Sequence, residues 1–144
     1  MLIGEYTHTL DDKKRISLPA KFRRELGKTV VLTRGLDNCL FLYSLSRWEQ
    51  ISEKLTQLSF GQSDSRNLNR FMLSGAVEAN VDSSGRILIP DVLKEFASLE
   101  DKVILAGVGN RVEVWNTESW EECKERIESQ ADMLAERLGD VGMI

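Results

Sequence analysis

The sequence predicts an α+β fold, a pseudo-dimeric β-barrel flanked by helices, in which two copies of one small module share a single chain. Two observations predict it. The segment at 11–19 recurs at 82–90, and in each copy short alternating segments typical of strands precede an apolar stripe typical of a helix. One copy offers about four short strands, too few to close a barrel or to cover its own edges. We therefore expect the two copies to complete one barrel between them.

The repeat extends well beyond that segment. Asp, Arg, Ile and Pro recur at an offset of 71 residues, and after one inserted residue the matches continue at an offset of 72. The matched pairs are Asp11 and Asp82, Arg15 and Arg86, Ile16 and Ile87, Pro19 and Pro90, Val31 and Val103, Gly35 and Gly107, Tyr43 and Trp115, and Trp48 and Trp120. We divide the chain into a first module at 1–58, a linker with a short helix at 59–75, a second module at 76–138 and a C-terminal tail at 139–144.

Each copy is expected to contain the same elements in the same order. Alternating residues predict first strands at 5–10 and 77–81, and the Asp-x-x-x-Arg segments are tight turns that lead into second strands at 15–18 and 86–89. Short helices are expected to begin at Pro19 and Pro90, since proline suits the first helical position. Further strands are predicted at 29–33, 39–43, 102–106 and 112–115.

A longer amphipathic helix is predicted to close each copy. Apolar residues recur at helical spacing from Trp48 to Leu58 and again from Trp120 to Leu138. Ser46 and Glu49 form a candidate capping box at the start of the first of these helices. A short helix is also expected around 66–73, after the linker.

Composition is that of a globular protein with an uneven distribution of charge. We expect no membrane helix, which needs about 18 apolar residues, and no signal peptide. Cys39 and Cys123 fit buried free thiols in a reducing cytoplasm. The net charge is −4, yet residues 13–28 hold seven cations against one anion, whereas residues 116–144 hold eight acids against three bases. The local field of the basic segment, more than the net charge, decides what that surface attracts.

The sequence offers little for catalysis. His8, the one histidine, has no serine or cysteine placed as a nucleophile, so a structural or surface role is the better interpretation. Asp11 with Asp12, or Asp11 with Asp82, could form paired carboxylates, but each adjoins a turn, where aspartate commonly accepts backbone hydrogen bonds. A phosphate-binding Gly-x-x-x-x-Gly-Lys-Ser/Thr loop does not occur, and a zinc site would lack ligands. We therefore expect no enzyme activity, no metal and no cofactor.

The basic residues of the first turn point to DNA instead. Lys13, Lys14 and Arg15 lie at or beside the turn, and a two-stranded ribbon can enter the major groove. Arginine can donate two hydrogen bonds to guanine, while lysine more often contacts phosphate. The first turn is therefore a candidate DNA-binding element.

An aspartate four residues before each arginine could brace the guanidinium group and shape the turn. The alternative for both pairs, Asp11–Arg15 and Asp82–Arg86, is a structural salt bridge of little energetic weight at a surface. The second turn carries Arg86 after small residues, whereas the first turn has two lysines and is followed along the chain by Lys21, Arg23 and Arg24. We expect the first half to make most of the DNA contact.

Taken together, these motifs resemble the MraZ family, whose members contain two SpoVT–AbrB modules, each marked by an Asp-x-x-x-Arg motif. The segments that carry the resemblance are Gly4–Asp11, Arg15–Arg23 and Val81–Pro90. The resemblance covers nearly the whole chain. One position departs from the family pattern, because Lys14 stands where the family usually has glycine.

The resemblance implies a swapped-hairpin β-barrel made within one chain and assembly into closed rings. It implies a nucleoid-associated transcriptional regulator, typically a repressor, of the division and cell-wall gene cluster that begins with its own gene. The expected partners are G-rich direct repeats in double-stranded promoter DNA and further copies of the chain, without a membrane or a small-molecule cofactor. DNA contact falls on Arg15 with Lys13 and Lys14, and extends to Arg86. The alternative is a protein-interaction or scaffold module without specific DNA binding.

Overall fold

The chain folds into strands and helices that repeat in the same order in its two halves, and the computed structural model describes residues 1–144. Their bounds are β1 Leu2–Thr9, β2 Arg15–Ser17, α1 Ala20–Leu26, β3 Thr29–Arg34, β4 Leu40–Ser44, α2 Leu45–Thr56, α3 Ser63–Leu73, β5 Val77–Asn80, β6 Arg86–Leu88, α4 Asp91–Phe96, β7 Lys102–Gly109, β8 Val112–Asn116 and α5 Thr117–Asp140. The α+β class and the order of elements agree with the prediction from sequence.

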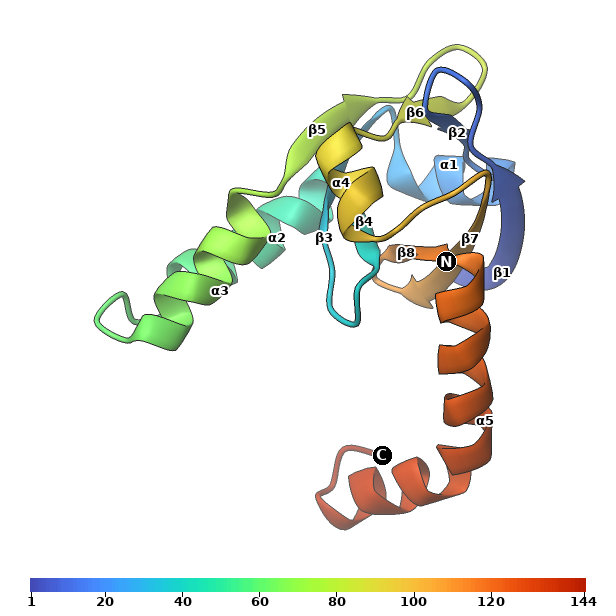
Figure 1. The fold of residues 1–144 in the computed structure, drawn as a ribbon. Coiled ribbons are helices and arrows are strands. Elements are labelled where there is room, and N and C mark those ends of the chain that lie inside the picture. Colours follow the sequence, from blue (N-terminus) through green and yellow to red (C-terminus); the bar gives the residue numbers. More distant parts are fainter.

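The two halves are interleaved through their strands. Six strands form one antiparallel sheet in the order β1-β7-β8-β4-β3-β5, so the first strand of each half pairs with the third strand of the other. Strands β2 and β6 lie outside this sheet and pair with each other as a separate antiparallel ribbon (Figure 1). Each half therefore supplies strands that complete the other.

The expected closed swapped-hairpin barrel is not confirmed. Strands β1 and β5 are the outer strands of the six-stranded sheet and do not pair with each other, so the sheet stays open. The reason is that the chain leaves this sheet before each Asp-x-x-x-Arg turn, and β2 and β6 satisfy their backbone groups in their own ribbon. The main core combines side chains of the sheet, the ribbon and helices α1 and α4, among them Ile16, Phe22, Ile87 and Leu93.

The opposite face of the sheet carries a second, smaller core beneath α2 and α5. Trp48 of α2 packs on Tyr43 with ring centroids 5.7 Å apart, and Trp120 of α5 packs on Trp115 at 5.4 Å. These aromatic pairs are the ones that recur in the sequence. They hold equivalent places in the two halves, so the repeat in sequence corresponds to a repeat in packing.

Two helix boundaries differ from the prediction. The N-cap of α2 is Ser44, whose hydroxyl accepts a hydrogen bond from the backbone N–H of Arg47 at 3.2 Å, so the predicted capping box of Ser46 and Glu49 is wrong. Ser44 is the last residue of β4 and has the extended backbone that an N-cap requires. Helix α3 begins at Ser63, three residues before the start of the helix that was predicted around 66–73.

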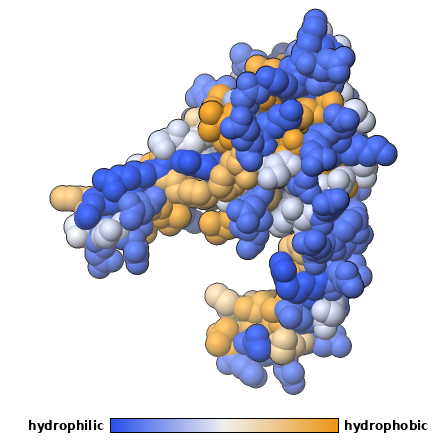
Figure 2. Space-filling view, in the orientation of Figure 1, coloured by the Kyte–Doolittle hydropathy of each residue, from blue (hydrophilic) through white to orange (hydrophobic).

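Helix α5 leaves the sheet and projects far from it (Figure 1). Cys123 near its start is buried, as is Cys39, and both thiols are free as predicted. Farther along the predicted stripe, Ile127, Leu134 and Leu138 are 38–45% exposed. Figure 2 shows apolar side chains gathered at the far end of this helix. None of the helices combines the length and the apolar character that crossing a bilayer requires.

We expect Ile16→Ala to lower the free energy of unfolding by about 2–5 kcal/mol, because it removes a fully buried side chain from the main core. Ile87→Ala should cost a similar amount, since the two isoleucines lie opposite each other in the ribbon. Urea unfolding followed by circular dichroism measures both changes.

Leu88→Ala is the matched control, because Leu88 lies in the same ribbon with a side chain that is 54% exposed. Its effect should stay within about 0.5 kcal/mol. An equally small effect of Ile16→Ala would contradict the role of the ribbon as one wall of the core.

Candidate nucleic-acid interface

The first Asp-x-x-x-Arg segment forms a tight turn held by its aspartate. Oδ1 of Asp11 accepts hydrogen bonds from the backbone N–H of Lys13 at 2.8 Å and of Arg15 at 2.9 Å. Oδ2 of the same carboxylate accepts from Nε of Arg15 at 3.0 Å. The backbone N–H of Asp11 also donates to the Arg15 carbonyl at 2.9 Å. One carboxylate thus closes the turn and fixes the arginine side chain.

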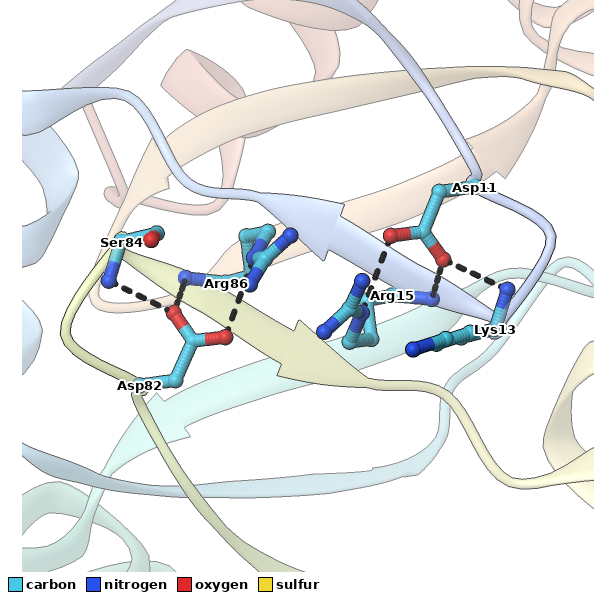
Figure 3. Close-up of polar contacts among 6 residues, drawn as sticks. All are labelled: Asp11, Lys13, Arg15, Asp82, Ser84 and Arg86. Atoms are coloured by element: carbon cyan, nitrogen blue, oxygen red, sulfur yellow. Dashed lines mark hydrogen bonds and ion pairs between the residues drawn. The ribbon is translucent and has the colours of Figure 1, made fainter.

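The second turn repeats this pattern of hydrogen bonds (Figure 3). Oδ1 of Asp82 accepts from the backbone N–H of Ser84 and of Arg86, both at 2.9 Å, and Oδ2 accepts from Nε of Arg86 at 3.0 Å. Both aspartates brace their arginines as predicted, and each pair is also an ion pair whose side chains are about one-third exposed. The salt bridge uses Nε, so both Nη groups of each guanidinium remain available to a ligand.

Strands β2 and β6 bring the two arginines onto one surface. Arg15 lies opposite Leu88 and Ser17 lies opposite Arg86, so the arginines occupy diagonal positions across the ribbon (Figure 3). Cα atoms at such positions are roughly 7–8 Å apart. We call the surface formed by Arg15, Ser17, Arg86 and Leu88 the ribbon face; the isoleucines between these residues point the other way, into the core.

Lys14 takes the place of the glycine found in the second turn. Its φ is +61°, in the left-handed region, and Gly85 has a φ of +79°. The first turn therefore keeps the same geometry although it lacks the glycine that is usual at this position, at a cost of about 1–2 kcal/mol. Nζ of Lys14 forms an ion pair with Asp91 of α4 at 2.5 Å, and both side chains remain partly exposed. Lys13, by contrast, is exposed.

Helix α1 does not lie beside the turn that precedes it in sequence. Arg23 lies against the second turn, where a Cβ on Gly85 would come within 2.0 Å of its Nη1. The carbonyl of Lys28 accepts a hydrogen bond from the backbone N–H of Val81 at 2.8 Å. The premise that Arg23 adds its charge to the first turn is therefore wrong. The reason is strand exchange, because the residue after β2, Leu18, bonds to the carbonyl of Gly85 and leads the chain towards the second turn.

The placement of Arg23 was not predicted from the sequence, although the repeat carried a signal for it. Two modules that complete each other must exchange segments. A helix of one module then lies beside a turn of the other, and residues adjacent in sequence need not share a surface.

Hydrogen bonds keep both turn carboxyls ionised. The backbone N–H of Arg15 is the main reason that the pKa of Asp11 lies below its usual value; the side chain of Arg15 and the N–H of Lys13 lower it further, while desolvation opposes them. The pKa of Asp82 is lowered in the same way, chiefly by the backbone N–H of Arg86. Each carboxyl is held inside its own turn, so the two do not form a carboxylate pair.

His8 lies in β1, where burial lowers the pKa of its imidazole. No group of three or more His, Cys, Asp or Glu side chains is arranged to hold a metal ion. The two turns and the ribbon face therefore remain the candidate site.

Known proteins of one family match the chain over nearly its full length. The family model described as "MraZ protein, putative antitoxin-like" matches twice, at residues 1–71 and 72–141. A protein named Transcriptional regulator MraZ from Caldanaerobacter subterraneus subsp. tengcongensis is 52% identical over 138 residues, which are 96% of each chain. Proteins of the same name from Thermoanaerobacter sp. and Oenococcus oeni are 50% and 46% identical, covering 99% and 97% of this chain and 100% and 98% of theirs.

We expect Lys14→Gly to raise the free energy of unfolding by about 0.5–1 kcal/mol, because glycine adopts the left-handed conformation of the turn without steric strain. The loss of the ion pair with Asp91 offsets part of this gain. Urea unfolding measures the change, and Asp91→Asn gives the contribution of the ion pair alone. A Lys14→Gly variant no more stable than Asp91→Asn would contradict strain at this position.

We expect acid to destabilise the protein partly through the turn carboxyls. Because the folded-state pKa of Asp11 is lowered, its contribution is complete above the unfolded-state value of about 4 and is lost as the pH falls through the folded-state pKa. Asp11→Asn should therefore lower stability at pH 7 and flatten the fall in stability below about pH 4. Urea unfolding across pH measures this, and Asp12→Asn, at the exposed neighbour, should leave the profile unchanged.

Proposed function

The chain belongs to the MraZ family, and on that premise we propose that it is a transcriptional regulator that binds double-stranded promoter DNA with its ribbon face. More specifically, we propose that it is a nucleoid-associated repressor of the division and cell-wall gene cluster, including its own gene. The contact would fall on G-rich direct repeats. The family resemblance and the fixed arginines of the two turns support this proposal.

The orientation of the two arginines is the observation that carries the proposal. Asp11 holds Nε of Arg15 and Asp82 holds Nε of Arg86, so each guanidinium presents its Nη groups in a fixed direction. Guanine offers O6 and N7 as paired acceptors in the major groove, and arginine is their most frequent partner. A two-stranded ribbon fits that groove, which is about 12 Å wide. Side chains fixed before binding lose less conformational entropy when they meet the base.

The distribution of charge favours the same orientation of the molecule. Helix α5 and the residues around it carry the chain's acidic excess, and Figure 1 shows this helix leaving the sheet on the side away from β2 and β6. DNA on the ribbon face would therefore meet Arg15 and Arg86, with Lys13 beside the first turn, while the acidic helix points away from it. The net charge of −4 is compatible with DNA binding, because the local potential governs the encounter.

Direct repeats favour a head-to-tail assembly over a two-fold dimer, because the reading units must follow one another in the same direction. Unpartnered apolar side chains lie on two projecting parts of the molecule: Leu134 and Leu138 on α5, and Phe60, 85% exposed, between α2 and α3. We propose that further copies of the chain cover these surfaces in a closed ring. A ring would bring several ribbon faces to successive repeats and raise affinity through effective concentration.

We expect Arg15→Ala to abolish binding to a duplex that carries the G-rich repeats upstream of the gene. Each lost bidentate contact costs about 1–3 kcal/mol, and an assembly with several ribbon faces multiplies the loss. Arg86→Ala should weaken binding comparably, because its turn has the same geometry. Fluorescence anisotropy measures binding, and sedimentation velocity checks that the assembly is unchanged.

Arg126→Ala is the control, since Arg126 is an exposed cation of α5 that lies before the apolar far end of this helix, and it should not affect DNA affinity. Binding that survives both Arg15→Ala and Arg86→Ala would exclude the ribbon face as the DNA contact. A stoichiometric protein partner, together with no salt-sensitive shift of the repeat duplex, would instead favour the protein-interaction or scaffold function.

A further inference from the structure

We infer that the cleft between α1 and the second turn is a binding site for a backbone phosphate of DNA, so that the Asp82–Arg86 end of the ribbon makes the stronger phosphate contact. This inference rests on the proposed function and deepens it. It also reverses the expectation from sequence, which assigned most of the DNA contact to the first turn.

The cleft joins the two halves and is rich in donors. It has a volume of about 450 Å³ and is lined by Arg23, Gly27, Lys28, Val81, Asp82, Ser83 and Gly85. Arg23 and Lys28 come from the first half and take part in none of the ion pairs of the chain. The carboxylate of Asp82 is already occupied by its own turn. The cleft therefore contains two cations without an ion-pair partner, Arg23 and Lys28, and one carboxylate, Asp82, whose oxygens already accept hydrogen bonds within the turn.

Arg23 has a nitrogen atom, Nε, that forms no hydrogen bond within the protein. Its Nε is buried and has no hydrogen-bond partner, which is costly for a guanidinium donor. No protein acceptor therefore holds this side chain in place, and turning it towards an anion breaks no existing hydrogen bond. A phosphate, with several acceptor oxygens, is the anion whose geometry suits an arginine fork.

Gly85 makes room for this arrangement. A Cβ at that position would lie 2.0 Å from Nη1 and 2.6 Å from Cζ of Arg23, so the guanidinium can approach only a residue without a side chain. The equivalent residue of the first turn is Lys14, whose side chain instead reaches Asp91 of α4. The two turns share their backbone geometry and differ in what lies beside them.

The cleft beside α4, the helix equivalent to α1 in the second half, has the opposite charge. Lys94, the repeat equivalent of Arg23, lies in a cleft of about 310 Å³ together with the carboxyl groups of Asp91, Glu95 and Glu100. Asp91 is already paired with Lys14, which leaves Glu95 and Glu100 against the ammonium group of Lys94. This cleft therefore disfavours a phosphate, whereas the cleft at Arg23 attracts one. The ribbon therefore has one end suited to the DNA backbone and one end that disfavours it.

The salt dependence of DNA binding by the full-length protein tests this inference. We expect Arg23→Ala and Lys28→Ala each to weaken binding several-fold, equally for the duplex with G-rich repeats and for a shuffled duplex of the same length. Each should reduce the slope of log affinity against log salt by about 0.9 for every phosphate contact that one chain loses. Arg23→Gln, which keeps a side chain of similar length without the charge, should give the same change of slope.

Lys94→Ala is the matched control, because it removes a cation from the equivalent position of the other half, and it should leave the slope unchanged. Thermal unfolding of each variant checks the fold, and Arg23→Gln replaces Arg23→Ala if the latter unfolds. An unchanged slope for Arg23→Gln and Lys28→Ala, or an equal reduction for Lys94→Ala, would overturn the inference.

Failure of the proposed function would look different. In that case Arg15→Ala and Arg86→Ala would leave the preference for the repeat duplex over the shuffled duplex intact. If those variants lose the preference while Arg23→Gln keeps the full salt slope, the ribbon face reads DNA and only the phosphate cleft is wrong.

Discussion

The antiparallel pairing of β2 with β6 is the interaction on which the rest of the structure depends. It sets Ile16 against Ile87 in the core and places Arg15 and Arg86 on the outer surface of the same ribbon. Since side chains alternate along a strand, a slip of one residue would turn arginines inwards and isoleucines outwards. Core packing thus enforces the register that the candidate DNA contact needs.

Much of the fold could be predicted from the sequence, because its elements have clear periods and occur twice. The strands at 29–33 and 112–115, and the helices that begin before Trp48 and Trp120, follow from alternation and helical spacing. The partner of each strand could not be read in this way. The unpaired edges of four short strands predicted that the two halves share strands. Only the three-dimensional arrangement shows that β2 and β6 form a separate ribbon and that the main sheet stays open.

The contacts within each turn of the candidate site were also predictable from the sequence, but the surroundings of the turns were not. The spacing of Asp11 and Arg15 led to the correct bracing contact, since an aspartate at that distance can reach both the turn amides and the guanidinium group. The surroundings of the turn were not predictable, because neighbours along the chain need not be neighbours in space. Arg23 follows the first turn in sequence and lies against the second, while Lys14 meets an acidic residue 77 positions later.

The difference between Lys14 and Gly85 has a consequence for how such a molecule can change. In a dimer of identical chains, every substitution alters both turns at once, and the two ends of the ribbon stay the same. Here each turn is encoded separately, so one end can lose its glycine and gain an acidic neighbour while the other keeps both its glycine and its arginine. A fused pair of modules can therefore make the two ends of its candidate DNA-contacting ribbon different, whereas a symmetric dimer of one module has two identical ends.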